Sequence, residues 1–304
     1  MRVLDTADIK EVLALAFSPD GRHLAAGANR LGSVVHDLAG GTPVRIGPEG
    51  FVWRAVLGFE PDGALATITT DGRTRFDPAT GTRLGVGPFD PEGPRPVPFF
   101  GASAAGTRLA TVQFWSPRSR LVCWDAVGGG WERRWFVDDR PAYCPPAVSP
   151  AGDRVAFFAA ETLGPGAAQQ LLVLDADSGQ PVGAGHYPYS ELHAPCYQPG
   201  GRQIVVPHAG VLVVWDARAL GKPVRVKNDT RQHFTAAAFH PSGRYLFTTS
   251  NDATVTVWDT DDWVRVKRFA WDIGRLRSVA VSADGLLAAA GSDRGRVVVW
   301  DVDV

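Results

Sequence analysis

The chain is poor in cysteine and has no long apolar run. Of its 304 residues only three are cysteines, and no stretch of about 18 apolar residues, the length of a membrane-spanning helix, occurs. Cys123, Cys144 and Cys196 are odd in number and widely spaced, so they fit neither a disulfide framework nor a zinc knuckle, and we expect them to be small buried apolar residues. Asp5 and Asp8 stand where a secretory signal needs apolar residues, so a cytoplasmic protein is expected.

Lysine is scarce as well, and charge of one sign does not dominate. Only four of the 31 basic residues are lysines, and the formal net charge is −1. Counterion release at phosphates needs a basic surface, so nucleic acid is not the expected partner, although a local arginine stripe stays open. Arginine suits bidentate contacts with carboxylates, which slightly favours protein partners, but the same bias is also typical of a GC-rich genome.

The sequence does contain one turn motif in seven copies, whose final glycines step by 42, 43, 46, 49, 42 and 42 residues. Proline presets φ near −65° and glycine adopts the left-handed conformation that closes a turn, so each copy is expected to join two antiparallel strands. The copies are Phe17-Ser-Pro-Asp-Gly21, Phe59-Glu-Pro-Asp-Gly63, Ala102-Ser-Ala-Ala-Gly106, Val148-Ser-Pro-Ala-Gly152, Tyr197-Gln-Pro-Gly-Gly201, Phe239-His-Pro-Ser-Gly243 and Val281-Ser-Ala-Asp-Gly285.

A second marker, an apolar run that ends in Asp, follows each turn. Such runs, for example Val211–Trp215, are too short for helices and rich in β-branched residues, which is typical of buried strands. No segment shows a convincing helical period. Four of the seven markers are Trp-Asp: His36-Asp37, Phe76-Asp77, Trp124-Asp125, Leu174-Asp175, Trp215-Asp216, Trp258-Asp259 and Trp300-Asp301.

With a period of about 44 residues, the whole chain resembles the WD-repeat (WD40) family. The resemblance implies an all-β fold, a seven-bladed β-propeller in which each repeat is a four-stranded antiparallel blade beside a central channel. The family's repeats often contain a network of Gly-His, Asp, Ser or Thr, and Trp. Here only blade six has Asp252, Thr254 and Trp258 at suitable spacing, and the single Gly-His pair is Gly185-His186.

The last repeat lacks its fourth strand, since only three residues follow Asp301. Met1–Leu4 is therefore expected to be the outer strand of the seventh blade, as the resemblance also implies. This closure removes open sheet edges and uses all 304 residues, so we expect one domain, 1–304.

Motifs for catalysis are absent. The sequence has no Gly-x-Ser-x-Gly, no His-Glu-x-x-His and no phosphate-binding loop, and its histidines form no i, i+2 or i, i+4 pair. We expect neither an enzyme nor a cofactor or metal. Fold alone does not decide function, so an enzyme or small-molecule binder that uses the central channel is the alternative, with His193 and His208 the best candidates for a channel site.

Blades three and four are longer than the others. From turn Gly to marker Asp the seven repeats measure 16, 14, 19, 23, 15, 16 and 16 residues. The additions fall at Phe114–Arg118 and Glu161–Gln169, on the face that holds the second-to-third-strand turns and the connections between blades. In the family this is the top face, and Tyr187–His193 leads into blade five on the same side.

Aromatic and arginine side chains on loops of a rigid scaffold are typical anchors of protein interfaces. The leading hypothesis is a non-catalytic, monomeric interaction scaffold whose top face and channel mouth bind a protein or peptide. That the aromatics fold inward is an equally weighted alternative. The predicted partner-binding residues are Phe114, Trp115, Arg118, Tyr187, Tyr189 and His193, with Arg54, Arg95, His208, Gln232 and Arg277 near the mouth.

Overall fold

The computed structural model describes residues 1–6, 9–28, 32–47, 57–69, 72–87, 96–103, 106–115, 118–127, 130–138, 144–160, 169–187 and 194–304. These residues contain strands, turns and bends, and no helix. The strands form seven four-stranded antiparallel sheets, which are the seven predicted blades of a β-propeller. The all-β fold class is therefore confirmed.

The chain divides into two compact units, unit 1 (Met1–Val86 and Asn228–Val304) and unit 2 (Gly87–Lys227). The blades of unit 1 are one, two, six and seven: β2 (Ala14–Phe17), β3 (His23–Ala28), β4 (Gly32–Asp37), β5 (Val44–Ile46); β6 (Leu57–Phe59), β7 (Leu65–Thr69), β8 (Gly72–Phe76), β9 (Arg83–Gly87); β22 (Phe234–Phe239), β23 (Tyr245–Ser250), β24 (Thr254–Asp259), β25 (Arg265–Ala270); and β26 (Leu276–Val281), β27 (Leu287–Ser292), β28 (Arg296–Asp301) with β1 (Arg2–Asp5).

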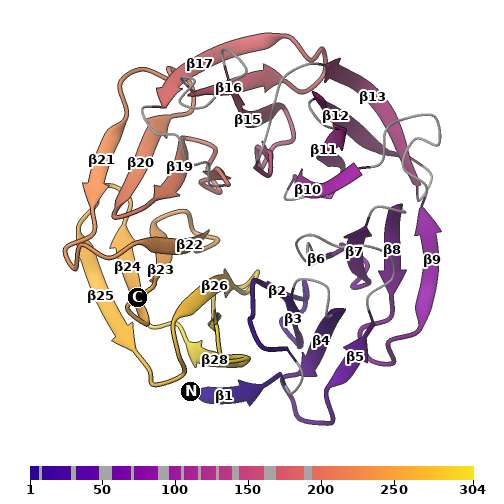
Figure 1. Cartoon of the computed structure of the whole chain (residues 1–304), viewed down its shortest axis with the longest axis vertical. Helices are drawn as coiled ribbons and strands as arrows, with labels where there is room; N and C mark the ends of the chain where they lie inside the picture. Colours follow the sequence, from indigo (N-terminus) through magenta and orange to yellow (C-terminus); the bar gives the residue numbers. More distant parts are fainter. Residues whose placement is uncertain are drawn as a thin grey trace. The chain divides into compact units, whose positions relative to one another are not determined.

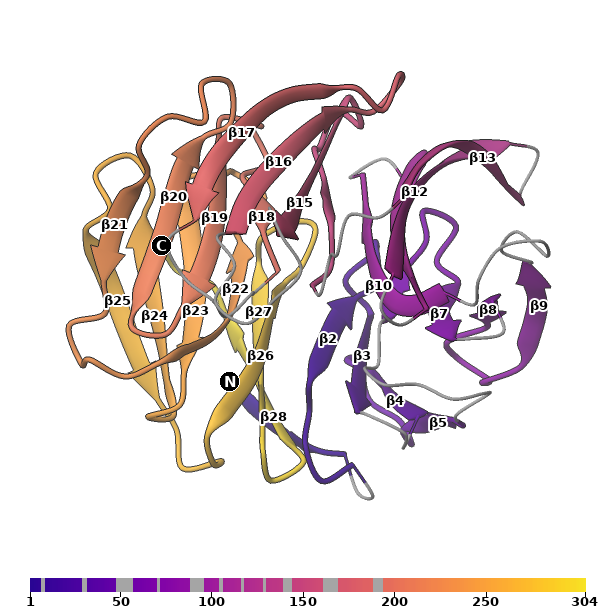
Figure 2. The ribbon, with the colours of Figure 1, turned by 45° about the horizontal axis from the view of Figure 1, so that its top comes forward.

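Unit 2 contains blades three, four and five. Their strands are β10 (Pro96–Ala102), β11 (Arg108–Trp115), β12 (Arg118–Val127), β13 (Gly130–Asp138); β14 (Ala147–Val148), β15 (Arg154–Ala160), β16 (Gln169–Asp175), β17 (Pro181–Tyr187); and β18 (Cys196–Tyr197), β19 (Gln203–His208), β20 (Val211–Asp216), β21 (Val224–Lys227). Figure 2 shows β15, β16 and β17 of blade four side by side.

The N-terminal strand completes the last blade. β1 pairs antiparallel with β28, in the register Arg2 with Val299 and Asp5 with Arg296. The sheet order is β1-β28-β27-β26, and Figure 1 shows β1 beside β28. The prediction that the head of the chain supplies the missing outer strand is confirmed, and β28 thereby has a neighbour on both edges.

The repeated turn is closed by its glycine and, in blades one, three, four and seven, by a serine. Gly21 has a φ of 70°, a conformation that disfavours residues with a Cβ. The Ser18 hydroxyl accepts a hydrogen bond from the backbone N–H of His23 at 2.8 Å, and Ser282 accepts one from Leu287 at 2.9 Å. The turn therefore satisfies its own polar groups within about six residues, which explains why it is legible in the sequence.

The marker aspartate has an equally local role, because it caps the turn that follows the third strand. The Asp175 carboxylate accepts hydrogen bonds from the N–H groups of Asp177 at 3.1 Å and Ser178 at 2.9 Å. These hydrogen bonds lower the pKa of Asp175. Asp37 and Asp216 cap the corresponding turns in blades one and five. An Asx turn of this kind needs Asp at the strand end, whatever residue precedes it.

The cores lie between neighbouring sheets. In unit 2, Phe158 and Leu171 of blade four are packed in one apolar cluster with Ile204 and Trp215 of blade five. Strands β16 and β20 lie inside their sheets, and each has four consecutive buried apolar residues, so these two strands are continuous apolar runs and do not alternate.

The family network that blade six suggested is arranged differently. The Thr254 hydroxyl donates to Asp252 at 2.7 Å, as that spacing allows, but the Trp258 indole Nε1 donates to Thr248 on β23 at 2.9 Å. In blade three, Trp124 donates in the same way to Thr111 at 2.8 Å. The acceptor is thus a threonine on the neighbouring strand.

Candidate interaction surfaces

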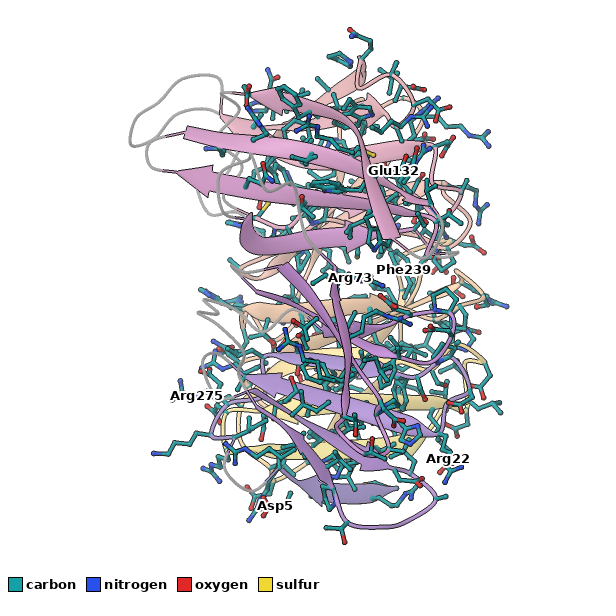
Figure 3. All side chains as sticks on the ribbon, turned by 90° about the vertical axis from the view of Figure 1, so that its right-hand side faces the viewer. Asp5, Arg22, Arg73, Glu132, Phe239 and Arg275 are labelled. Atoms are coloured by element: carbon teal, nitrogen blue, oxygen red, sulfur yellow. The ribbon has the colours of Figure 1, made fainter. Side chains whose placement is uncertain are left out.

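Each blade has two ends with different chemistry. Because successive strands run antiparallel, the turns after the first and third strands share one end, the turn end, and the remaining loops share the other, the connection end. Figure 3 shows Asp5 and Arg275, which lie in or beside connections, on one side of unit 1, and Arg22, which lies in a turn, on the opposite side.

Seven of the predicted partner-binding residues fall wholly or partly outside what the structure describes. Arg54, Arg95, Tyr189 and His193 lie outside the described residues. The backbone of Phe114, Trp115 and Arg118 is described, and it differs from the expected loop. β11 continues to Trp115 and β12 begins at Arg118, with these two residues paired, so blade three is enlarged by a longer strand pair.

Tyr187 is not an exposed anchor, and the prediction that it would be one is wrong. It is the last residue of β17, and only 1% of its surface is exposed. Its ring packs against Phe158 at 4.6 Å and Trp215 at 6.2 Å between centroids. The alternative, that an aromatic residue of this segment folds inward, holds for Tyr187, because the neighbouring blade provides an apolar site for its ring.

His208, predicted near the channel mouth, is also mostly buried. It ends β19 with 9% of its surface exposed, and its ring meets the Tyr187 ring edge-on at 5.8 Å. His208 therefore belongs to the packing between blades four and five. It offers little surface to a partner, contrary to the prediction.

Gln232 is exposed, as a contact residue should be, and its loop is held by a buried side chain. Asn228 donates from Nδ2 to the Gln232 carbonyl at 2.9 Å and to the Ser250 hydroxyl at 3.1 Å. The His233 N–H donates to the Asn251 side chain at 3.2 Å. Arg231, Gln232 and His233 therefore project from a loop whose backbone is fixed.

Arg277 is partly exposed and belongs to a cluster of charges at the start of blade seven. Its guanidinium lies 3.1 Å from the Glu11 carboxylate and 3.9 Å from Asp293. Asp293 also accepts a hydrogen bond from the Arg275 N–H at 3.0 Å. Asp293 thus fixes this connection as Asn228 fixes the preceding one, while the Arg275 and Arg294 side chains are exposed.

These residues define a connection surface on unit 1. Its exposed side chains are Lys10, Arg231, Gln232, His233, Arg275 and Arg294. Four of the six carry a positive charge. The same connections and turns also hold the acidic residues Glu11, Asp229, Asp252, Asp272 and Asp293. Sequence reasoning found Gln232 and Arg277 but missed the other five. Their place in the repeat could have identified them. Each lies either between the last strand of one repeat and the first strand of the next, or in the turn between second and third strands.

The described residues offer little for catalysis or metal binding. No group of three or more His, Cys, Asp or Glu side chains among them could hold a metal ion. Burial raises the pKa of the Cys123 thiol to about 11 and that of Cys196 to about 12, so both stay protonated and poorly nucleophilic. All three cysteines are free thiols. Cys123 and Cys144 are buried as expected, whereas Cys196 is partly exposed. No helix in the described part of the chain is long and apolar enough to cross a membrane.

Comparison with known families identifies the repeat. The model of the WD domain, G-beta repeat (WD40), matches residues 4–33, 221–259 and 270–301. The matched regions include the first repeat and the last two, and together span about a third of the chain. The chain therefore carries WD40 repeats, and the resemblance read from its turns and Trp-Asp markers is confirmed.

Two curated proteins are similar to a short part of the chain. Pre-mRNA-processing factor 19 homolog 2 of Arabidopsis thaliana is 32% identical over 79 residues, which are 26% of this chain and 15% of that protein. Pre-mRNA-processing factor 19 of Oryza sativa subsp. japonica is 31% identical over 72 residues, 24% of this chain and 14% of that protein. The similarity is thus confined to about a quarter of the chain and about a seventh of each relative.

Among solved structures, a chain of Kuenenia stuttgartiensis hydrazine synthase has a similar fold. The TM-score is 0.76, with 98% of this chain and 97% of that chain covered, at 18% sequence identity. At this identity the likeness establishes the β-propeller fold and carries nothing about activity.

Proposed function

We propose that the protein is a non-catalytic protein-interaction module, monomeric and cytoplasmic, whose connection ends bind a protein or peptide partner. The observation that carries the proposal is the WD40 match to blades six and seven, because WD40 propellers generally bind proteins and these blades hold most of the connection surface. Exposed arginines on loops fixed by Asn228 and Asp293 support it, since a rigid arginine-rich loop loses little entropy on binding.

A second candidate function is an enzyme or small-molecule binder that uses the central channel implied by the family. The sequence motifs favour the interaction module, because no nucleophile or acid–base pair is apparent.

The experiment is an affinity pull-down from native cytoplasm with identification by mass spectrometry, followed by titration of the recovered partner. The double variant Arg275→Ala with Arg294→Ala should weaken binding by about 10-fold or more, the value of one or two interface arginines. The matched control, Arg22→Ala with Arg244→Ala, alters exposed arginines of the turn end in the same unit and should leave affinity within about twofold. Equal binding by all three proteins, or loss in the control alone, would refute the connection surface.

A further inference from the structure

A cavity lies at the turn end between blades four and five, within unit 2, and the function proposed above does not use it. Its volume is about 480 Å³, within the range of ligand pockets. It is lined by the first turns of both blades, by Val182 and Gly183 of β17, and by Ala217, Arg218 and Leu220 of the turn after β20. We call it the blade four–five groove.

The groove is open because two consecutive residues of the first turn of blade five are glycines and have no side chain. Blade five carries Gly200-Gly201 where blades one, two and seven have Asp-Gly. Gly200 stands at the position of the Asp, and a Cβ added to it would meet only the Arg202 Nε atom, 4.0 Å away. In blade one the equivalent Asp20 accepts a hydrogen bond from Ser18 at 2.5 Å. The blade five turn therefore lacks a carboxylate that would occupy this space and repel an anion.

Tyr197 is the second unusual feature of the groove. It lines the cavity, yet its hydroxyl oxygen is buried and has no hydrogen-bond partner among the described residues. The same position of the other six turns holds only Phe, Val or Ala. The fold thus does not need this hydroxyl, and an unpartnered buried hydroxyl costs about 1–3 kcal/mol. A ligand that supplies a partner would offset this cost.

The charges of the groove select the ligand. Asp153 accepts a hydrogen bond from Ser149 at 2.7 Å, and Arg154 is paired with Asp175 at 2.8 Å. Arg218 is exposed at the groove, and its side chain makes no ion pair with any residue that the structure describes. Burial raises the pKa of Tyr197, so its hydroxyl keeps its proton and can donate. The lining therefore carries the Asp153 carboxylate, the paired Arg154 and the unpaired Arg218, a formal charge of +1, and the Tyr197 hydroxyl adds one hydrogen-bond donor.

We propose that the blade four–five groove binds an acidic segment of an extended peptide, with a carboxylate on Arg218 and a carbonyl or carboxylate oxygen on the Tyr197 hydroxyl. The apolar edge formed by Val182, 51% exposed, and Leu220 would accept an aliphatic side chain of the same segment. This site is at the turn end, so it is separate from the connection surface, and either can fail without the other.

Unit 1 contains the corresponding groove with the opposite charge. The cavity between blades one and two, about 300 Å³, is lined by Asp20, Asp62 and Asp77 as well as His23. In blade two the residue equivalent to Tyr197 is Phe59, which has no hydroxyl. An acidic peptide should therefore avoid it, which makes it an internal control.

The test uses two fluorescein-labelled peptides, Gly-Leu-Glu-Val-Glu-Gly and its Gln counterpart, titrated with the full chain by fluorescence anisotropy. We expect the Glu peptide to bind at least 10-fold more tightly than the Gln peptide. Arg218→Gln should weaken binding of the Glu peptide about 10-fold, because a charged hydrogen bond is lost. Tyr197→Phe should weaken it about three- to 10-fold, because a hydrogen bond from a neutral hydroxyl is lost. Arg22→Gln, in the turn of blade one, should change affinity less than twofold.

Two further measurements decide the outcome. Tyr197→Phe should keep or raise the melting temperature, because Phe occupies this position in three other turns; a fall would mean that the hydroxyl is structural and would overturn the proposal. Hydrogen exchange should show protection by the Glu peptide at 149–154 and 197–203. Equal affinity for both peptides, no binding at 1 mM peptide, or protection in blades one and two would also overturn it. Displacement by glutarate as efficient as that by unlabelled peptide would assign the groove to small dicarboxylates instead.

Discussion

The four blades with a Trp-Asp marker hold their tryptophans in two ways. In blades three and six the indole N–H donates to Thr111 or Thr248, two residues beyond the tryptophan's cross-strand partner. In blades five and seven the equivalent positions are Val206 and Ala290, and the indole N–H of each tryptophan has no acceptor among the described residues. The same dipeptide therefore carries a hydrogen bond in one pair of blades and packing alone in the other.

Packing replaces the hydrogen bond differently in these two blades. Trp215 lies against Gly185 of blade four, whose missing side chain leaves room for the ring. Trp300 packs at a tilt within an aromatic cluster, 4.8 Å from Trp271 and 5.9 Å from Phe269 between centroids. Aromatic pairs of this geometry contribute about 0.5–1.5 kcal/mol each beyond their buried area, which is comparable to a hydrogen bond. A blade thus tolerates the loss of the network when a neighbour supplies apolar surface.

The largest effect is expected from removing residues 1–5. Blade seven takes its outer strand from the other end of the sequence, whereas the four strands of blade six are consecutive in the sequence. Deletion removes the whole β1 pairing and exposes the edge of β28. We expect either aggregation or a fall of several kcal/mol in the free energy of unfolding. Each kcal/mol lowers the melting temperature by about 2 °C or more.

Circular dichroism melting and light scattering measure both consequences. Val3→Thr, which keeps the backbone pairing of β1, is the control and should melt close to the parent protein. An unchanged midpoint without aggregation after the deletion would contradict the role of β1.

Gly185→Ala should be the most damaging single substitution at the tryptophan of blade five. The new Cβ would lie 2.7 Å from the Trp215 Nε1 atom and 3.1 Å from Cδ1, so a buried ring must move. Overpacking of this kind costs about 1–3 kcal/mol. Gly85→Ala on the outer strand of blade two adds a Cβ in open space and is the matched control. Urea denaturation should separate the two variants, and similar midpoints would mean that the fit of Trp215 against Gly185 is unimportant.

Thr248→Val tests the blades whose tryptophan indole donates a hydrogen bond to a threonine. It leaves the Trp258 N–H buried without its acceptor, at a cost of roughly 1–2 kcal/mol in the free energy of unfolding. The reverse change in blade five, Val206→Thr, should bring no gain, because Trp215 is already fixed against Gly185. Denaturant titration of both variants measures the difference. Stabilisation by Val206→Thr would show that blade five merely lacks a hydroxyl.

The smallest effect concerns blade one, where His36 replaces the tryptophan. Burial lowers the pKa of His36, so the folded state holds it neutral while the unfolded state takes up a proton near pH 6.5. Above about pH 6.5 His36 is neutral in both states and does not lower the free energy of unfolding. Below that pH the free energy of unfolding falls by up to about 1.4 kcal/mol per pH unit, because the unfolded state alone takes up the proton. His36→Phe should reduce the slope of stability between pH 6.5 and 5. An identical slope in parent and variant would remove His36 as its source.

The repeat and the fold could be predicted from the sequence because their determinants are local. A glycine with positive φ, in four blades a serine that caps its own turn, and an aspartate that caps the next turn all act within about six residues. Seven copies of such signals in register also led to the prediction that the head of the chain pairs with the last repeat, and β1 does pair with β28.

The surfaces depended on which blades are neighbours. Tyr187 has the composition of an interface anchor, but an apolar site formed by blades four and five buries it. The connection surface and the blade four–five groove bring together residues from different repeats, among them Glu11 with Arg277 and Val182 with Tyr197. Sequence alone determined the strands and their order through short-range turn chemistry. Only the tertiary structure decided which side chains are buried, paired or free, because that depends on packing against a sheet about 40 residues away.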